Sequence, residues 1–384
     1  MVEIHGEVED GFAAVADAFV ENFEQRGELG AACSLFVEGR QVVDLWAGTA
    51  NSATQEPWTS DTMALVFSAT KGATAICIGM LVERGMLDYD APVAAYWSEF
   101  AAAGKEAVTV SQLMSHQAGL IFADPPLGLK EVLAVDPVVE ALAAQLPRWE
   151  PGSMHGYHAL TYGWLAGELV RRVDGRRIGR FFADEVAAPL GLDFWIGLPE
   201  AEECRVAVLR GAPRPEGDEL ELMMKIAGPG TNGGRALTMD GALAISGPGM
   251  SFNTRAVHAT EMPAANGITT ARSLARMYAA TIGEVDGVRL AQDSTVDQMR
   301  REQVRGPDAC LVLETRFGHG FMLHCDTSPL LAEGSFGHYG AGGSLGFADP
   351  ATGIGFGYVM NAMGGGIAGD PRAVALTDAV RRCS

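Results

Sequence analysis

The stretch Phe67-Ser68-Ala69-Thr70-Lys71-Gly72 carries the strongest signal in the chain, a serine and a lysine three residues apart. Residues three apart lie on the same face of a helix, so the Lys71 amine can reach the Ser68 hydroxyl if a helix begins here. A lysine in an apolar environment loses proton affinity and can take a proton from a neighbouring hydroxyl. The spacing therefore predicts that Ser68 is a nucleophile activated by Lys71.

An S-x-x-K pattern alone also has a purely structural interpretation, in which Ser68 caps a helix and Lys71 is a solvated residue of its first turn. The surrounding sequence favours the nucleophile. Lys71 lies within residues 69–82, a run that is otherwise apolar or small, where a solvated side chain is out of place. The N–H groups at a helix start also favour negative charge.

The composition is that of an ordinary globular protein, with 48% hydrophobic and 20% charged residues in a chain of 384, so disorder is not expected. The formal net charge is -20 at pH 7. A field of this sign repels the phosphates of nucleic acids and anionic membrane surfaces. Neither nucleic acid nor membrane is therefore an expected partner.

The expected compartment is the cytoplasm. Residues 1–10 are rich in acidic side chains, whereas a secretory signal begins with basic residues and continues with an apolar region. The apolar run 75–82 is much shorter than the roughly 20 residues that a membrane-spanning helix needs. The six cysteines include no C-x-x-C pair, which favours reduced thiols over a disulfide framework or a zinc site.

The hydrophobic pattern predicts strands near both ends of the chain and helices in the middle. The expected strands are 31–37, 41–47, 317–324, 334–339, 343–349 and 353–361, and the expected helices are 10–24, 71–84, 109–116, 136–145, 160–173, 177–187, 236–245, 271–281 and 370–382.

This order favours one antiparallel sheet assembled from both termini, with a helical insertion, over two sequential domains. We expect residues 1–69 and 300–384 to form a discontinuous α/β sheet unit. Residues 70–299 are expected to form a mainly helical inserted unit. The active site would then lie between the two.

Five stretches occur in a characteristic order and spacing. They are 67–72 (FSATKG), 113–120 (LMSHQAGL), 151–153 (PGS) with Tyr157, 189–192 (PLGL) and 337–344 (GHYGAGGS). The set resembles the serine β-lactamase and penicillin-binding-protein superfamily, in particular its class C-like esterases, the family VIII carboxylesterases. The resemblance covers nearly the whole chain. It implies a β-lactamase-like fold, an antiparallel sheet flanked by helices with an inserted helical domain, and hydrolysis through an acyl-enzyme.

In this family a tyrosine opens the second motif, and Tyr157 matches it. A phenol can relay a proton between Ser68, Lys71 and a leaving group, and a neighbouring ammonium would lower the pKa of Tyr157 from about 10. The alternative is a structural tyrosine with a satisfied hydroxyl. Ala159 stands where the family often has asparagine, so a side-chain amide contact to substrate is missing.

The third motif of β-lactamases is typically K-T-G, whereas this chain has His338-Tyr339-Gly340. The change removes a cation that would hold the carboxylate of a β-lactam, which favours esters. Gly340 is expected to let substrate approach the strand closely. By resemblance, the N–H groups of Ser68 and Ala341 would form the oxyanion hole. The alternative for His338 is a histidine with only structural hydrogen bonds.

Two other patterns point to different chemistry. Ser344 lies in a G-x-S-x-G pattern, but a nucleophile elbow needs a helix after the serine and a histidine later in the chain, and a strand is expected here. Histidine and cysteine pairs complete no zinc-ligand spacing. These pairs are His155 with His158, and His319 and His324 with Cys325. We therefore expect no metal and no cofactor.

The sequence therefore predicts a serine hydrolase that cleaves short-chain carboxylic esters, with a small-molecule ester as its partner. Two alternatives use the same nucleophile, a β-lactamase or D,D-peptidase and an acyltransferase. A third is a catalytically inactive binding protein on the same scaffold. The sequence does not determine the oligomeric state, the physiological ester, or which of Lys71 and Tyr157 is the base.

Overall fold

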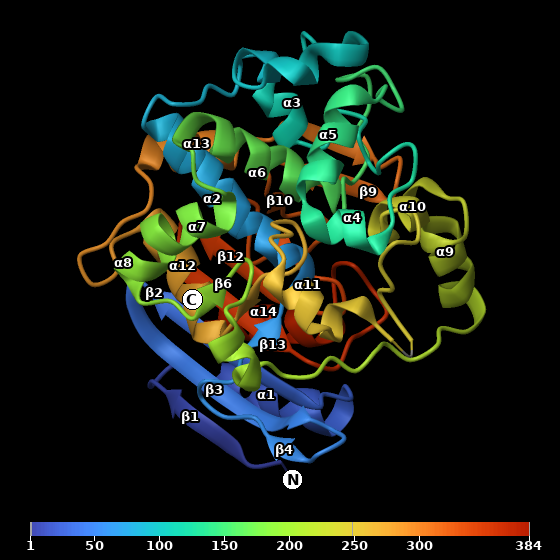
Figure 1. The fold of residues 1–384 in the computed structure, drawn as a ribbon. Coiled ribbons are helices and arrows are strands. Elements are labelled where there is room, and N and C mark those ends of the chain that lie inside the picture. The colour runs from blue at the N-terminus through green and yellow to red at the C-terminus, as the bar shows by residue number, and fades with distance from the viewer. Residues whose placement is uncertain (1, 248, 384) are drawn as a thin grey trace.

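Strands from both ends of the chain form one antiparallel sheet (Figure 1). This computed structural model describes residues 2–247 and 249–383. In spatial order the strands are β1 (Ile4–Val8), β3 (Arg40–Asn51), β2 (Gly30–Val37), β13 (Ile354–Met360), β12 (Leu345–Asp349), β11 (Phe336–Tyr339), β10 (Met322–Leu323), β9 (Glu314–Phe317) and β8 (Val304–Pro307). A short strand β4 (Glu56–Pro57) pairs with β3 outside this order. The predicted antiparallel α/β fold is confirmed.

The pairing of β2 with β13 joins the N-terminal hairpin to the C-terminal strands, with Cys33 opposite Tyr358. Every residue of β11, β12 and β13 is buried, so helices must cover both faces of this part of the sheet. Continuous apolar runs rather than strict alternation are the sequence signature of such doubly covered strands.

The helices lie mostly in the chain between the two groups of strands. They are α1 (Ala13–Gln25), α2 (Thr70–Glu83), α3 (Val110–Met114), α4 (Leu129–Ala134), α5 (Asp136–Ala144), α6 (Thr161–Asp174), α7 (Ile178–Phe182), α8 (Ala188–Leu190), α9 (Gly217–Ala227), α10 (Asn232–Thr238), α11 (Arg255–Ala259), α12 (Ala271–Ile282), α13 (Asp293–Met299) and α14 (Pro371–Cys383).

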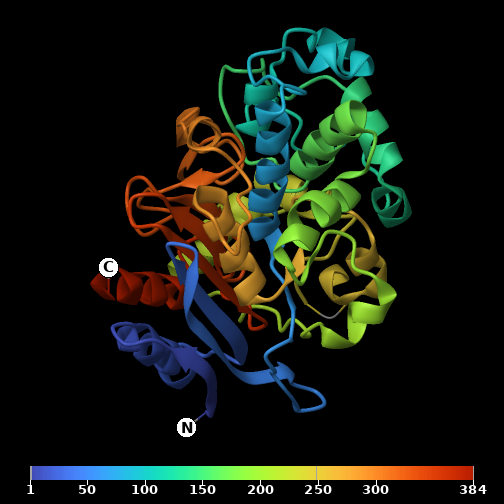
Figure 2. The same cartoon turned by 90° about the vertical axis from the view of Figure 1, so that its left-hand side faces the viewer.

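The sheet lies between two helical layers (Figure 2). Helices α1 and α14 pack together on its outer face, and α12 packs across β13, β2 and β12 on the other. Helix α2 stands between the C-terminal strands and α6 (Figure 2). Its residues Thr70 to Leu81 are all buried, which places a helix with no polar face at the centre of the molecule.

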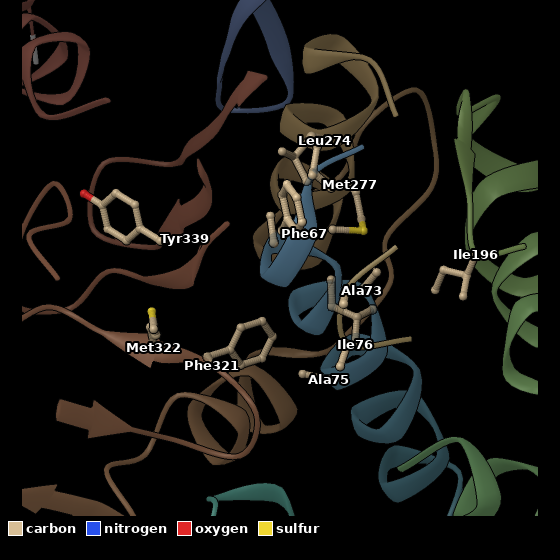
Figure 3. Close-up of a cluster of buried hydrophobic side chains, with 14 of the residues drawn as sticks. Phe67, Ala73, Ala75, Ile76, Ile196, Leu274, Met277, Phe321, Met322 and Tyr339 are labelled. Carbon is tan, nitrogen blue, oxygen red and sulfur yellow. The ribbon is translucent and has the colours of Figure 1, made fainter. Parts of the chain in front are cut away.

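The start of α2 is packed from two directions (Figure 3). Leu274 and Met277 approach from α12, and Phe321 comes from the hairpin between β9 and β10. Ala73 and Ile76 of α2 are fully buried among them. The first turn of α2 is therefore held by two elements that come much later in the chain.

A second, small sheet precedes α2. It consists of β5 (Ala64–Leu65), β7 (Ile268–Thr269) and β6 (Phe194–Trp195), all antiparallel. Strand β5 leads directly into the S-x-x-K stretch, so this sheet fixes the direction from which the chain enters α2. Strands of two residues leave no periodicity, so this sheet could not be predicted from the sequence.

Two predicted elements are wrong. The expected helix at 236–245 is α10, which begins at Asn232 because the Thr231 hydroxyl caps it, and ends before Met239, whose φ of +51° is left-handed. The expected strand at 317–324 is two strands, β9 and β10, in which Phe317 pairs with Met322. The chain reverses between them through Gly318 and Gly320, residues that tolerate a tight turn.

The expected division into 1–69 with 300–384 and an inserted unit 70–299 stays a prediction. Helix α12 lies within the range assigned to the insertion but packs on the main sheet. We propose that the helical unit ends before Ala271. The apolar face of α12 explains its place, since it needs the sheet to bury Leu274 and Met277.

Within residues 2–247 and 249–383, no helix has both the length and the apolar character that crossing a bilayer requires.

Candidate active site

Ser68 lies in a 3-10 turn, Phe67–Ala69, between β5 and α2. Thr70 holds this turn in place. Its hydroxyl donates to the Phe67 carbonyl at 2.5 Å and accepts the N–H of Gly267 at 2.8 Å. Ser68 is 7% exposed, so the nucleophile has little contact with solvent.

Phe67 adopts a φ of +45°, in the left-handed region that a bulky residue rarely occupies. Its ring packs against Phe252 with the centroids 4.9 Å apart. The N–H of Ala69 donates to the Val66 carbonyl at 3.1 Å. These contacts hold Ser68 in the first turn, where backbone N–H groups have no partner within the helix and can serve an anion.

Lys71 is fully buried, and its Nζ lies 3.1 Å from Ser68 Oγ. The amine also donates to the carbonyl oxygens of Ala159 at 2.7 Å and Ala264 at 3.0 Å. Burial lowers the pKa of Lys71 well below its usual value, because a charged ammonium is costly in this environment. The lysine is thus equipped to be a neutral amine beside the serine.

Tyr157 stands beside this pair, with Lys71 Nζ 4.6 Å from the ring centroid. In the described part of the chain, its buried Oη makes no hydrogen bond. Burial raises the pKa of Tyr157, and the nearby Ser68 hydroxyl offsets only part of the rise. The expected lowering of this pKa is therefore wrong, because Lys71 is itself buried and does not supply the ammonium that the expectation required.

A buried carboxylate, Asp308, holds the loop that carries Tyr157. Asp308 Oδ1 accepts the backbone N–H of Tyr157 at 3.0 Å. The same oxygen accepts the N–H groups of Cys310 at 2.8 Å and Leu311 at 2.9 Å. Asp308 belongs to no motif and lies 151 residues from Tyr157, so its role could not be predicted from the sequence.

Two buried histidines complete the support of this loop. His158 donates from Nδ1 to the Gly156 carbonyl at 2.7 Å and accepts the Leu120 N–H at Nε2, 3.0 Å away. Its own backbone N–H donates to His116 Nδ1 at 3.2 Å. Burial lowers the pKa of His158 to about 4 and that of His116 well below its usual value, so both rings are neutral at pH 7.

His338 lies on β11, its ring centroid 6.0 Å from that of Tyr157. Its Nδ1 must carry the proton, because it lies 2.7 Å from the Tyr339 carbonyl, which can only accept. Burial lowers the pKa of His338 to about 3. Nε2 is consequently a buried acceptor, and it has no partner among the described residues.

Gly340 allows a close approach by the protein itself. A Cβ at this position would lie 2.1 Å from the carbonyl oxygen of Val66, two residues before the nucleophile. The expectation that glycine makes room for substrate is therefore revised, since the Ser68 turn occupies that space. This contact brings the end of β11 beside the nucleophile.

Ala341 follows and is half-buried. Its neighbours use their N–H groups within the fold, Gly340 to the Ser344 carbonyl at 2.7 Å and Gly342 to the Gly366 carbonyl at 3.0 Å. The Ala341 N–H, in contrast, has no partner in the described ranges. An unused N–H at this position is what an oxyanion donor requires.

The competing patterns are not assembled into sites. Ser344 is fully buried and is followed by β12 rather than by a helix, which does not fit a nucleophile elbow. His155 bonds the Thr315 hydroxyl at 2.8 Å, away from the partners of His158. His319 stacks on Tyr89 with the centroids 3.8 Å apart. Each ring is committed to a structural contact.

Comparison with known proteins places the chain in a family. The family model described as Beta-lactamase matches residues 12–379. A curated relative, Esterase/beta-lactamase LipL of Mycobacterium tuberculosis, is 38% identical over 371 residues, which cover 93% of this chain and 83% of LipL.

Solved structures agree over the full length. The chain is 39% identical to a family VIII carboxylesterase, with a TM-score of 0.87 and 100% of both chains covered. A penicillin-binding protein homolog from Caulobacter crescentus is 40% identical, with a TM-score of 0.89 and the same coverage. The predicted resemblance is confirmed: the chain belongs to the beta-lactamase family and is a hydrolase with the beta-lactamase fold.

Proposed function

We propose that this hydrolase cleaves short-chain carboxylic esters through an acyl-enzyme on Ser68. The observation that carries the proposal is the 3.1 Å separation between Lys71 Nζ and Ser68 Oγ in a buried site. The names of LipL and of the family VIII carboxylesterase, at 38% and 39% identity, support ester hydrolysis. The low exposure of Ser68, 7%, favours small acyl groups.

Lys71 acts as the base that activates Ser68. A neutral amine has two N–H groups, and the carbonyls of Ala159 and Ala264 can only accept them. The amine's lone pair is then left for the Ser68 hydroxyl. The Ala159 carbonyl thus supplies an acceptor in the motif where the family's asparagine is missing. As Ser68 Oγ bonds to the ester carbonyl carbon, its proton passes to Lys71 Nζ.

Tyr157 acts as the acid for the leaving alcohol. Because burial raises its pKa, the phenol keeps its proton at pH 7 until a stronger base forms nearby. When the ester C–O bond breaks, the alkoxide takes the Tyr157 proton, and the phenolate takes the proton that Lys71 holds. The alcohol leaves, and Ser68 carries the acyl group.

Hydrolysis of the acyl-enzyme reverses these transfers. Water attacks the acyl carbon and gives a proton to the Tyr157–Lys71 pair, and the Ser68 oxygen recovers a proton as the carboxylic acid leaves. In both steps the N–H groups of Ser68 and Ala341 hold the oxyanion. Loss of one such donor typically slows turnover by about 10²–10³-fold.

His338 favours uncharged esters over β-lactams. Its Nε2 offers a lone pair, whereas binding the carboxylate of a β-lactam needs a donor or a cation. A pKa of about 3 means that the ring does not become an imidazolium near neutral pH. An ester that carries a hydroxyl or N–H near the carbonyl can use this acceptor.

The test compares p-nitrophenyl acetate, butyrate and decanoate with a chromogenic cephalosporin. Wild type is assayed beside Ser68→Ala and Tyr157→Phe, which removes one oxygen from a buried ring. We expect acetate and butyrate to be turned over fastest, the cephalosporin slowly, and Ser68→Ala to be inactive. Tyr157→Phe should lose about 10²-fold or more in kcat.

Full ester turnover by Ser68→Ala would refute the proposal. Faster turnover of the cephalosporin than of any ester would instead identify a β-lactamase, in keeping with the second part of the name Esterase/beta-lactamase LipL. Addition of methanol to the assay tests for an acyltransferase, which would form the methyl ester in preference to the acid.

A further inference from the structure

We propose that Arg372 is a positioning residue for the oxyanion hole, and that its guanidinium fixes the loop that carries Ala341. The inference rests on the proposed function, because it assumes that the Ala341 N–H receives the oxyanion. Arg372 lies at the start of α14, far from Ser68 in sequence and outside all five motifs.

All five N–H groups of the Arg372 side chain are used. Nε and Nη2 form a two-pronged pair with Asp370, at 3.0 and 2.9 Å. Nη1 donates to Glu28 Oε1 at 3.0 Å and to the Ala362 carbonyl at 2.7 Å. The second hydrogen of Nη2 goes to the Gly342 carbonyl at 2.7 Å. A planar fork with every donor engaged has one orientation.

The Gly342 carbonyl belongs to the residue that follows Ala341, so this last bond acts on the oxyanion loop itself. The same carbonyl accepts the N–H of Gly364 at 2.8 Å, which ties the loop to the segment before α14. A Cβ at Gly343 would lie 2.9 Å from Arg372 Nη2. The loop therefore lies directly on the guanidinium, and movement of the guanidinium would turn the Ala341 N–H.

The cluster is anchored to the outer face of the sheet, where α14 packs beside α1 (Figure 2). The Arg372 backbone N–H donates to Asp370 Oδ1 at 2.9 Å, and its carbonyl accepts from Asn22 Nδ2 at 3.3 Å. Glu28 reaches in from the turn between α1 and β2, and Tyr358 of β13 donates to it. Arg372 is thus held in one position by these partners, and it holds the loop in one position in turn.

Stability alone does not account for this cluster. Arg372 is 4% exposed, and both its carboxylate partners are buried. Burying such a group of charges is close to neutral for stability, since desolvation offsets the attraction, whereas it fixes geometry strongly. A cluster of this kind in contact with a loop of three glycines supplies the rigidity that the loop itself lacks.

The test uses Arg372→Lys, which keeps the charge but cannot engage five acceptors. Arg176→Lys is the matched control, because Arg176 is likewise held by carboxylates, those of Asp174, Asp184 and Glu185, away from the loop. For Arg372→Lys we expect kcat for p-nitrophenyl acetate to fall about 10-fold or more, with KM within a factor of about two. Arg176→Lys should lower the melting temperature and leave kcat unchanged.

A second variant, Asp370→Asn, keeps the shape of the cluster and loosens only the fork, so it covers the case in which Arg372→Lys does not fold. It should show a smaller fall in kcat, again without a change in KM. The inference would be overturned if both variants kept the wild-type kcat. It would also be overturned if Arg176→Lys, at an equal loss of melting temperature, lost as much kcat as Arg372→Lys.

The rate of phosphonylation by a p-nitrophenyl phosphonate separates this inference from the proposed function. The phosphoryl oxygen needs the same two N–H donors, and the site of labelling reports the nucleophile. If wild type is not labelled at Ser68, the proposed function fails. If wild type is labelled there and Arg372→Lys reacts at the wild-type rate, only the role of Arg372 fails.

Discussion

The neighbours of Lys71 determine what its amine can do. Two backbone carbonyls, of Ala159 and Ala264, hold the amine against Ser68 Oγ, and burial disfavours its charge. Lys105 offers a natural comparison. It is also buried and also donates to two carbonyls, of Ala102 and Gln145. Among residues 2–247 and 249–383 no serine hydroxyl bonds its amine, so we assign Lys105 a structural role.

Replacing each lysine by arginine tests this difference. Lys71→Arg replaces the neutral amine by a guanidinium that stays charged and cannot accept a proton, so we expect kcat/KM to fall by about 10²–10⁴-fold. Lys105→Arg should lower stability and keep most of the activity. Steady-state kinetics on p-nitrophenyl acetate, with melting temperatures for both variants, are the measurement. Equal losses of activity would show that both lysines are structural.

Glu28 gives a prediction for stability. Burial raises its pKa from the usual 4.5 to about 7, despite Arg372 and Tyr358, so the folded protein holds a proton that the unfolded chain releases above pH 4.5. The corresponding stabilisation, about 3 kcal/mol, is fully present below pH 4.5 and is lost as the pH rises through about 7.

Glu28→Gln should remove this pH dependence, because an amide does not titrate and keeps the shape of the carboxyl. Urea unfolding between pH 4.5 and 8 is the measurement. The control is Glu203→Gln, which changes a partly exposed carboxylate that pairs with His258. An unchanged slope of the unfolding free energy against pH in Glu28→Gln would contradict the assignment.

At the scale of elements, the contact between β11 and the Ser68 turn positions the site. The chain passes so close that a Cβ on Gly340 would meet the Val66 carbonyl at 2.1 Å. Gly340→Ala must push the end of β11 away from the turn. We expect a loss of about 1–3 kcal/mol in the free energy of unfolding and a larger relative loss of kcat, since Ala341 moves with the strand.

Gly283→Ala is the control for this substitution, because a Cβ there meets nothing nearer than the Ala279 carbonyl at 3.8 Å. Thermal unfolding and kcat are measured for both variants. Gly340→Ala with wild-type kcat would show that the position of β11 does not matter for turnover.

Elements with a clear hydrophobic pattern were predicted well from the sequence, and elements without one were not. Helix α2 was expected at 71–84 and spans Thr70–Glu83, and β13 was expected at 353–361 and spans Ile354–Met360. Strand β1 was missed because its residues alternate weakly around Gly6 on an exposed edge. Helix α9 was missed because glycine and proline surround it, and only Ile226 of its apolar residues is buried.

The site was predictable only where side chains form local motifs. The contact between Ser68 and Lys71 could be predicted from their spacing. The role of the Ala159 and Ala264 carbonyls as acceptors for Lys71 could not be predicted, since every residue has a carbonyl and only the fold selects these two. Asp308 and Arg372 act across the fold from positions that resemble no motif. The predicted pKa direction of Tyr157 was wrong because burial raises the pKa of the phenol and also keeps Lys71 from supplying an ammonium.

At the scale of the whole molecule, the net charge of -20 should influence which esters reach the site. A negative field slows the approach of anionic esters and aids cationic ones, and salt screens both effects. We expect kcat/KM for an anionic ester such as a succinate monoester to rise with ionic strength. For a neutral ester of the same length it should stay constant. A salt response of the same sign for both esters would show that the field has no part in selection.

The central claim is that turnover passes through an acyl group on Ser68, and trapping this intermediate tests it most directly. Wild type and Ser68→Ala are mixed with p-nitrophenyl acetate, quenched in acid within the first turnover and digested for peptide mass spectrometry. We predict one acetylated peptide, the one that contains Ser68, in wild type and none in Ser68→Ala. Acetylation of a Ser344 peptide instead, or full turnover with no acetylated peptide, would contradict the account.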